Sequence, residues 1–120
     1  MKILVIEDNQ DNRELVAFVL EHAGHEITTA VNGVEGIEAA KKQHPDLILL
    51  DLALPEMDGW EVAKKLSTDP STTEITLVAL TAFTAPEDKR RAMEAGCDGY
   101  LSKPINAATF PGEVAKFLKK

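Results

Sequence analysis

Acidic, hydroxyl and basic side chains stand directly after short apolar runs in this sequence. Glu7 and Asp8 follow residues 3–6, Asp51 follows residues 47–50, Thr81 follows residues 77–80, and Lys103 follows residues 99–102. Carboxylates that crowd together repel one another and raise at least one pKa unless a cation intervenes. Carboxylate oxygens with open water positions suit Mg²⁺, a lysine suits a phosphoryl oxygen, and a threonine adds a hydroxyl donor. Brought together, these groups match phosphoryl transfer to a carboxylate nucleophile.

The apolar runs before these residues have the character of strands buried on both faces. Residues 3–6 are uninterrupted and rich in β-branched side chains, and residues 47–50 form the clearest run. Residues 26–30, 77–80 and 99–102 complete a set of five predicted strands. Between and after the strands, amphipathic stretches with apolar residues at helical spacing predict five helices.

Strands that alternate with helices from end to end predict an α/β fold, with a parallel five-stranded sheet covered on both faces. We expect a doubly wound (βα)5 sandwich of the flavodoxin-like kind, with strand order 2-1-3-4-5. In that order strands one, three, four and five are neighbours, so their carboxyl ends meet at one edge of the sheet. Strand two ends in Ala30, Val31 and Asn32, which offer little chemistry. This asymmetry predicts a single site.

Length and charge narrow the class of protein. The chain has 120 residues with 13 basic and 20 acidic side chains, so its formal charge is −7, and we expect residues 1–120 to form one domain. The acidic excess argues against nucleic-acid binding. Cys97 is the only cysteine, which excludes an internal disulfide, and neither a secretory signal nor a membrane-spanning run is visible. These features predict a cytoplasmic protein.

Four motifs occur in order along the chain, each at the end of a predicted strand. They are Ile6-Glu7-Asp8-Asn9, Leu50-Asp51-Leu52-Ala53-Leu54-Pro55-Glu56-Met57-Asp58-Gly59, Leu80-Thr81-Ala82, and Tyr100-Leu101-Ser102-Lys103-Pro104. Together they resemble the receiver domain of two-component response regulators, and the resemblance covers essentially the whole chain. The acidic start followed by Asn12-Arg13, and the stretch ending in Lys103-Pro104, are more similar to receivers of phosphorelays and hybrid kinases than to those of flagellar motors.

The resemblance implies a phosphoacceptor and a metal site. Asp51 would accept the phosphoryl group. Mg²⁺ would be bound directly by Asp8, mainly through water by Glu7, and also by Asp51 and the backbone carbonyl of Ala53. The chain would thus be a phosphoprotein whose acidic residues serve both the metal and the transfer.

The resemblance also implies a switch. Thr81 would donate to the phosphoryl group, and Lys103 would pair with the phosphate or with Asp51. The peptide bond between Lys103 and Pro104 would be cis. Tyr100 has two interpretations, either a packing residue or a switch residue that turns inward when Thr81 moves.

The helix predicted after the fourth strand has an unusual composition for a packed helix. Thr84 and Glu87 have the spacing of a capping box, and the helix is expected at residues 86–95. It has few large apolar residues, chiefly Met93. We therefore expect weak anchoring, as a movable element requires.

The family implies a set of partners. A histidine kinase or histidine phosphotransfer protein would supply the phosphoryl group, and a downstream target protein would sense it. We expect neither a nucleic-acid nor a membrane partner, and a monomer or a weak phosphorylation-dependent dimer. The chain would assist its own phosphorylation and dephosphorylation without being a turnover enzyme.

Two other classes stay open at this point. A phosphatase with an aspartate nucleophile would usually have a second acid two residues after Asp51, where this chain has Ala53. A flavodoxin-like binding module would need a phosphate-binding loop after the first strand, where Glu7 and Asp8 are anionic instead. Turnover of a phosphomonoester would favour the first, and a yellow flavin-bound protein the second.

Overall fold

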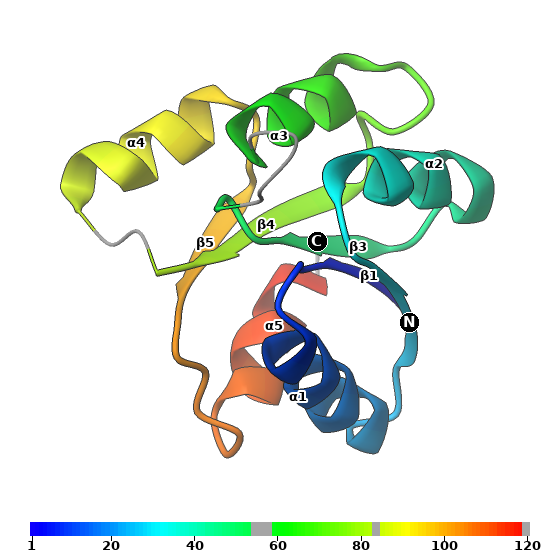
Figure 1. Ribbon diagram of the computed structural model, residues 1–120, viewed down its shortest axis with the longest axis vertical. Helices are drawn as coiled ribbons and strands as arrows, with labels where there is room; N and C mark the ends of the chain where they lie inside the picture. Colours follow the sequence, from blue (N-terminus) through cyan, green and yellow to red (C-terminus); the bar gives the residue numbers. More distant parts are fainter. Residues whose placement is uncertain (54–58, 83–84, 119–120) are drawn as a thin grey trace.

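A computed structural model describes residues 1–53, 59–82 and 85–118. The strands within them are β1 (Lys2–Ile6), β2 (Glu26–Ala30), β3 (Leu47–Leu50), β4 (Thr76–Thr81) and β5 (Gly99–Ser102). The helices are α1 (Gln10–His22), α2 (Gly33–Gln43), α3 (Gly59–Thr68), α4 (Pro86–Glu94) and α5 (Phe110–Leu118). Figure 1 shows the strands between two groups of helices.

All the strand pairs are parallel, and the order across the sheet is β2-β1-β3-β4-β5. This confirms the predicted architecture and strand order. The register pairs Ile6 with Leu50, and Thr81 with Ser102. Strands β1 and β3, and likewise β4 and β5, therefore end level with one another, and the residues that follow them meet at one edge of the sheet.

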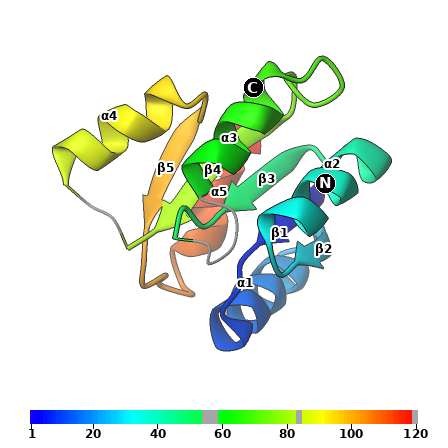
Figure 2. The same cartoon turned by 45° about the horizontal axis from the view of Figure 1, so that its top comes forward.

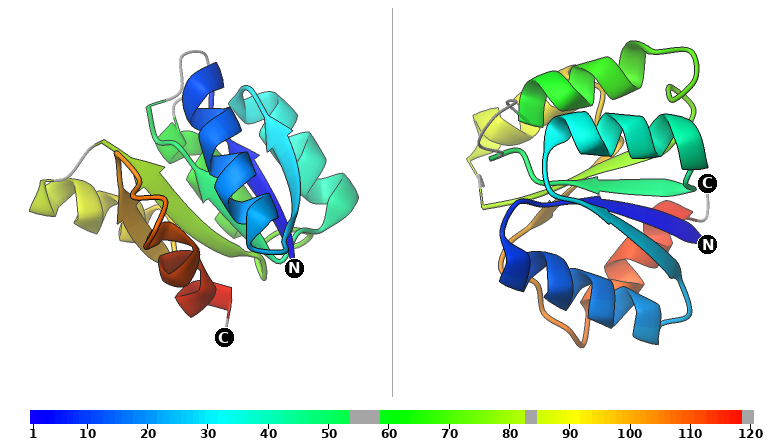
Figure 3. Two further views of the ribbon diagram at one scale, coloured as in Figure 1. Left: turned by 90° about the horizontal axis from the view of Figure 1, so that it is seen from below. Right: turned by 45° about the vertical axis from the view of Figure 1, so that its right-hand side comes forward.

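Alternate residues of the central strands pack into two cores, one on each face of the sheet. Leu4, Ile48 and Leu50 face α2, α3 and α4, whereas Ile3 and Leu49 face α1 and α5. Figure 2 shows α4 beside β5, and the right-hand view in Figure 3 shows α1 and α5 on the opposite side of the sheet from α2 and α3. Burial on both faces explains why β1 and β3 read as continuous apolar runs.

Two asparagines begin the helices that follow β1 and β2. The side chain of Asn9 accepts a hydrogen bond from the Asn12 amide at 3.0 Å, and Asn32 accepts one from the Glu35 amide at 2.8 Å. Each bond satisfies a backbone donor that the helix itself leaves unpaired. Cap residues directly after β1 and β2 turn the chain immediately away from the sheet edge.

Helix α3 begins against the end of β3. A Cβ atom on Gly59 would lie 2.4 Å from the Cα of Leu52 and 2.7 Å from the carbonyl oxygen of Asp51. Backbone atoms cannot yield as a flexible side chain can, so only glycine fits there. The first turn of α3 also contains Trp60, which is buried in the core.

Helix α4 differs from the prediction in its first turn. It begins at Pro86, and its first turn is closed by the Asp88 carboxylate, which accepts from the Ala85 amide at 3.2 Å. Proline suits the first position of a helix because it has no N–H to satisfy, and this start makes Asp88 rather than Glu87 the reciprocal residue. The proposed cap Thr84 lies outside the described residues. Ala92 is buried whereas Met93, the largest apolar side chain of the helix, is 50% exposed, so little apolar surface holds α4 in place.

Candidate functional site

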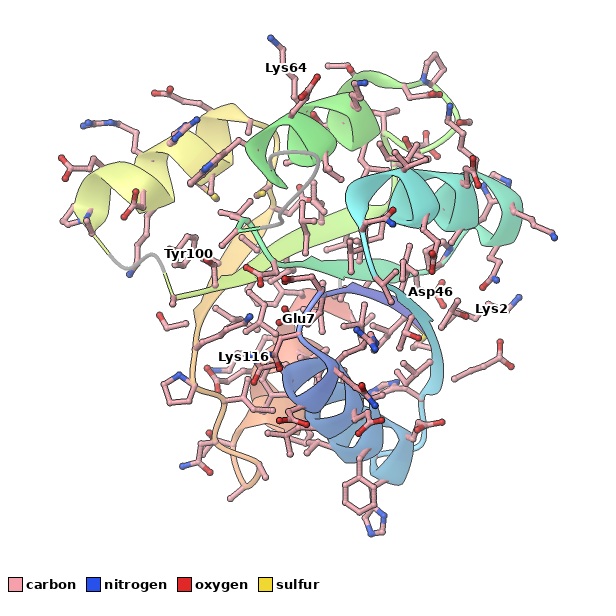
Figure 4. All side chains as sticks on the ribbon, viewed as in Figure 1. Lys2, Glu7, Asp46, Lys64, Tyr100 and Lys116 are labelled. Carbon is pink, nitrogen blue, oxygen red and sulfur yellow. The ribbon has the colours of Figure 1, made fainter. Side chains whose placement is uncertain are left out.

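Side chains from four segments gather at the carboxyl edge of the sheet. Glu7 follows β1 and is 2% exposed, Asp51 follows β3 and is 6% exposed, and Thr81 ends β4 fully buried. Asp8 is exposed beside them. The backbone fixes these positions because the Glu7 amide donates to the Ala30 carbonyl, and the Asp51 amide to the Ile6 carbonyl, each at 3.0 Å. Figure 4 shows Glu7 remote from Lys2 and Asp46.

Lys103 joins the two buried carboxylates. Its Nζ donates to Oδ2 of Asp51 at 2.9 Å and also to Oε1 of Glu7. The Lys103 side chain is 16% exposed, so the ion pairs are largely shielded from water. The Lys103 amide donates to the Thr81 carbonyl at 3.0 Å, which continues the pairing of β4 and β5 past the end of the strands. The next peptide bond, between Lys103 and Pro104, is cis.

The two oxygens of Asp51 have different partners. Oδ2 accepts from Lys103, whereas Oδ1 accepts from the Ala53 amide at 3.0 Å. This second bond closes a tight turn of the kind that aspartate favours. It fixes the carboxylate orientation and brings the backbone of Ala53 to the site, while the Ala53 side chain is exposed.

The buried charges shift the pKa of two site residues. Burial raises the pKa of Glu7 to about 7, and the Asp51 carboxylate raises it too, against the opposing effect of Lys103. For Lys103, desolvation acts to lower the pKa, but the hydrogen bonds to Glu7 and Asp51 outweigh it, and the pKa is raised. Lys103 therefore keeps its positive charge, and Glu7 changes charge near neutral pH.

The three acids form a group that could hold a cation. Glu7, Asp8 and Asp51 each offer one carboxylate oxygen, and these oxygens all lie within 4.8 Å of one another. Carboxylate oxygens are the ligands that Mg²⁺ prefers. Two of the three residues are buried and one is exposed, so an ion there would contact both protein and water.

Tyr100 lies apart from the acids, between β5 and α4. The Lys89 ammonium is 5.8 Å from the centre of its ring, and Figure 4 shows Tyr100 on the α4 side of the sheet. Burial, with a smaller effect of the Asp88 charge, raises the pKa of Tyr100. Among the described residues, its buried hydroxyl has no hydrogen-bond partner.

Two residues contact the acidic segment without having been predicted to do so. The guanidinium of Arg13 donates to the carbonyl oxygens of Glu7 and Asp8, at 3.0 and 3.3 Å, and the Asn9 amide donates to Oε2 of Glu7 at 3.3 Å. Arg13 could have been noticed from the sequence, because a basic residue near a helix N-terminus opposes the helix dipole. A cation at that position indicates a compensating partner nearby.

Comparison with known proteins identifies the family. Residues 3–115 match the model of the response regulator receiver domain. Curated relatives include the polar-differentiation response regulator DivK of Brucella ovis and that of Brucella anthropi. Each is 37% identical over 116 residues, which cover 97% of this chain and 94% of the relative. The chain therefore belongs to the response regulator receiver domains of two-component signal transduction.

Solved structures agree with this assignment. The chemotaxis protein CheY4 of Vibrio cholerae superposes with a TM-score of 0.91 at 31% identity, with 97% of each chain covered. The receiver domain of the sensor histidine kinase PA1611 from Pseudomonas aeruginosa gives a TM-score of 0.90 at 27% identity, covering 99% of this chain and 98% of that one. That structure has a magnesium ion coordinated in its active-site cleft.

The helices in the described parts of the chain can be compared with the requirements of a membrane-spanning segment. None of them combines the length and the apolar character that a membrane-spanning segment needs.

Proposed function

We propose that Asp51 accepts a phosphoryl group from a phosphohistidine of a histidine kinase or phosphotransfer protein. The observation that carries this proposal is a buried carboxylate with both oxygens held, one by Lys103 and one by the Ala53 amide, beside two further acids. One oxygen of Asp51 attacks phosphorus, the P–N bond of the donor breaks, and the imidazole nitrogen leaves with the electron pair. The fixed orientation lowers the entropic cost of this attack.

The acidic group fits Mg²⁺, because hard oxygen donors converge from three carboxylates. In this proposal Glu7, Asp8 and Asp51 hold the ion together with the backbone carbonyl of Ala53. When bound, the ion would neutralise negative charge on the phosphoryl oxygens. The magnesium in the receiver of the Pseudomonas kinase supports the same chemistry here.

Lys103 and Thr81 would respond to the added phosphoryl group. The Nζ of Lys103 is 2.9 Å from Oδ2 of Asp51, so its ammonium is placed to pair with phosphoryl oxygens. Thr81 ends the neighbouring strand β4, and its hydroxyl would donate to the same group. Phosphorylation thus adds charge and acceptor oxygens where a cation and a donor already stand.

Movement of Thr81 would bias two arrangements of Tyr100 and α4. The Tyr100 ring has a cation beside it, and its buried hydroxyl lacks a partner within the described residues, so a turn of the ring breaks no hydrogen bond to that hydroxyl. Because α4 buries Ala92 alone among its residues, little apolar packing opposes its displacement. Residues 1–120 would act as one receiver domain that changes its affinity for a downstream protein, as a monomer or a weak phosphorylation-dependent dimer, without turnover of substrate.

The direct test is phosphorylation by a small phosphodonor. Incubation with Mg²⁺ and acetyl phosphate or phosphoramidate should add one phosphoryl group, measured by intact mass. Asp51→Asn should abolish the adduct. Asp46→Asn should retain it, because Asp46 lies at the opposite end of β3, where it accepts from the Lys2 amide.

Two results would contradict the proposal. One is an adduct that persists in Asp51→Asn, and the other is an unlabelled wild-type protein under conditions that label a known receiver. Repeated turnover of a phosphomonoester would instead favour the phosphatase class.

A further inference from the structure

Arg13 makes side-chain contacts to the backbone of both acidic residues that follow β1. Its Nη1 donates to the carbonyl oxygen of Glu7 at 3.0 Å and to that of Asp8 at 3.3 Å. The residue is half-buried in the first turns of α1. One nitrogen therefore holds two successive peptide groups in the segment that connects β1 to α1.

These peptide groups lie where the sheet no longer supports the chain. The Glu7 amide still bonds to the Ala30 carbonyl, but β1 ends at Ile6, and within the described residues no backbone amide donates to the carbonyl of Glu7 or Asp8. The bond to the Glu7 carbonyl is partly buried, where a polar backbone group needs a partner, and the bond to the Asp8 carbonyl lies at the exposed surface. Arg13 supplies that partner, and the orientation of each carbonyl restricts the direction of the side chain on the same residue.

The place of Arg13 on the helix supports a local role. A basic residue near a helix N-terminus is unfavourable for the dipole, so the guanidinium gains little from α1 itself. Arginine also differs from lysine in presenting rigid, planar N–H donors rather than a mobile point charge. A rigid donor shared by two carbonyls is suited to holding a segment in one shape.

We propose that Arg13 is a positioning residue, which fixes the backbone of Glu7 and Asp8 so that their carboxylates face the cation held beside Asp51. The inference rests on the proposed function, because it assumes that these acids hold Mg²⁺. Arg13 touches neither the reacting atoms nor any of the three carboxylates in the contacts that the structure shows. Its effect would pass through the peptide groups alone.

Mg²⁺ binding to purified wild-type, Arg13→Gln and Arg13→Lys proteins would test this, by calorimetric titration at a temperature where all are folded. Positioning predicts that Arg13→Gln weakens binding about 10-fold or more, the usual size of effects through residues that support metal ligands. Arg13→Lys should restore part of the affinity. The control Arg90→Gln, which removes the same charge from the exposed face of α4, should change affinity less than twofold.

A role as a positive charge and a role as a positioning residue predict opposite changes in Mg²⁺ affinity when Arg13 is replaced. If Arg13 acted only as a positive charge near the site, removing it would make Mg²⁺ bind more tightly, and high salt would erase the change. Under positioning, binding weakens and the loss persists at high salt. In the metal-free protein, amide hydrogen exchange at Asp8 and Asn9 should also be faster in Arg13→Gln than in the wild type.

Wild-type affinity or tighter binding in Arg13→Gln would overturn the proposal, as would a wild-type protein that does not bind Mg²⁺. If Arg13→Gln fails to fold, Arg13→Lys decides, since a lysine with unaltered affinity and amide exchange would refute a role for the planar donor. Labelling of Asp51 is measured separately, so failure of this inference leaves the assignment of the acceptor standing.

Discussion

Lys103 and Arg91 are both basic residues near the ends of neighbouring elements, but the structure holds them in different ways. Lys103 is 16% exposed and donates to two buried carboxylates. Arg91 is exposed on α4, with its guanidinium carbon 4.3 Å from the centre of the Trp60 ring. At the carboxyl edge of the sheet, burial fixes each charge against a charged partner. On α4, the cationic groups of Lys89 and Arg91 lie over aromatic rings and remain exposed to solvent.

This contrast teaches where each kind of contact is useful. Buried ion pairs are costly to break because the remaining charge has no solvent to stabilise it. Contacts between a cation and a ring at the surface are worth little and break easily. A site that must hold its geometry has the first kind, and an element proposed to move has the second.

The substitution with the largest expected effect removes the Lys103 cation from the carboxyl edge of the sheet. In metal-free protein at pH 8, Lys103→Met should lower the free energy of unfolding by about 3 kcal/mol, because Glu7 and Asp51 are left buried without their partner. The loss should shrink at pH 6, since Glu7, with its pKa of about 7, then carries a proton. Urea denaturation at both pH values measures the effect.

Lys64→Met provides the matched control, because Lys64 is exposed on α3. It should change the unfolding free energy by less than about 0.5 kcal/mol. A loss below about 1 kcal/mol for Lys103→Met at pH 8 would remove the distinction between the two regions.

A pH series on Glu7→Gln tests separately whether burial at the sheet edge shifts the pKa of Glu7. The pKa of Glu7 is about 7 in the folded protein, against 4.5 for a glutamate outside the fold. The folded state therefore holds the proton more tightly. The resulting stabilisation is complete below pH 4.5 and is lost as the pH rises to 7. Relative to Glu7→Gln, the metal-free wild type should therefore lose on the order of 2 kcal/mol between pH 4.5 and 7.5.

Chelator-treated protein and urea denaturation at several pH values give this difference. The exposed Glu21 on α1 provides the control substitution Glu21→Gln, whose curve should run parallel to that of the wild type. A parallel curve for Glu7→Gln as well would show that burial does not shift the Glu7 pKa.

The smallest effects are expected on α4. Arg91→Ala should cost about 0.5–1 kcal/mol, through loss of the contact with Trp60. Met93→Ala should cost less than about 0.5 kcal/mol, because Met93 is 50% exposed. Amide hydrogen exchange along α4 should quicken in Arg91→Ala and stay unchanged in Met93→Ala. Equal effects of the two substitutions would indicate that apolar packing, rather than the cation, anchors the helix.

The sequence was sufficient for the sheet and for the residues at its edge. Continuous apolar runs identify strands buried on both faces, and the polar residue after each run must then lie at the carboxyl edge. In this way Glu7, Asp51, Thr81 and Lys103 could be placed near one another before any coordinates. Which carboxylate oxygens Lys103 would contact depends on side-chain rotamers, and no pattern in the sequence encodes those.

Two features of the structure were beyond such patterns. The sequence places a cation near the start of α1, but Arg13 acts on backbone carbonyls, which every residue has, so the residue types do not show which groups it contacts. On α4, Ala92 and Met93 are adjacent and point about 100° apart. With so few apolar residues, the periodicity of the sequence could not decide which of the two faces the core, and the structure buries the smaller one.

The close approach of Gly59 to the end of β3 has a practical consequence. Backbone atoms of Asp51 and Leu52 lie where any side chain at position 59 would stand, so a shift of the acceptor backbone must pass to the first turn of α3. Trp60, the only tryptophan in the chain, is the next residue in that turn. The molecule thus carries its own fluorophore one residue from the contact, and we expect its emission to respond to changes at Asp51 without an added label.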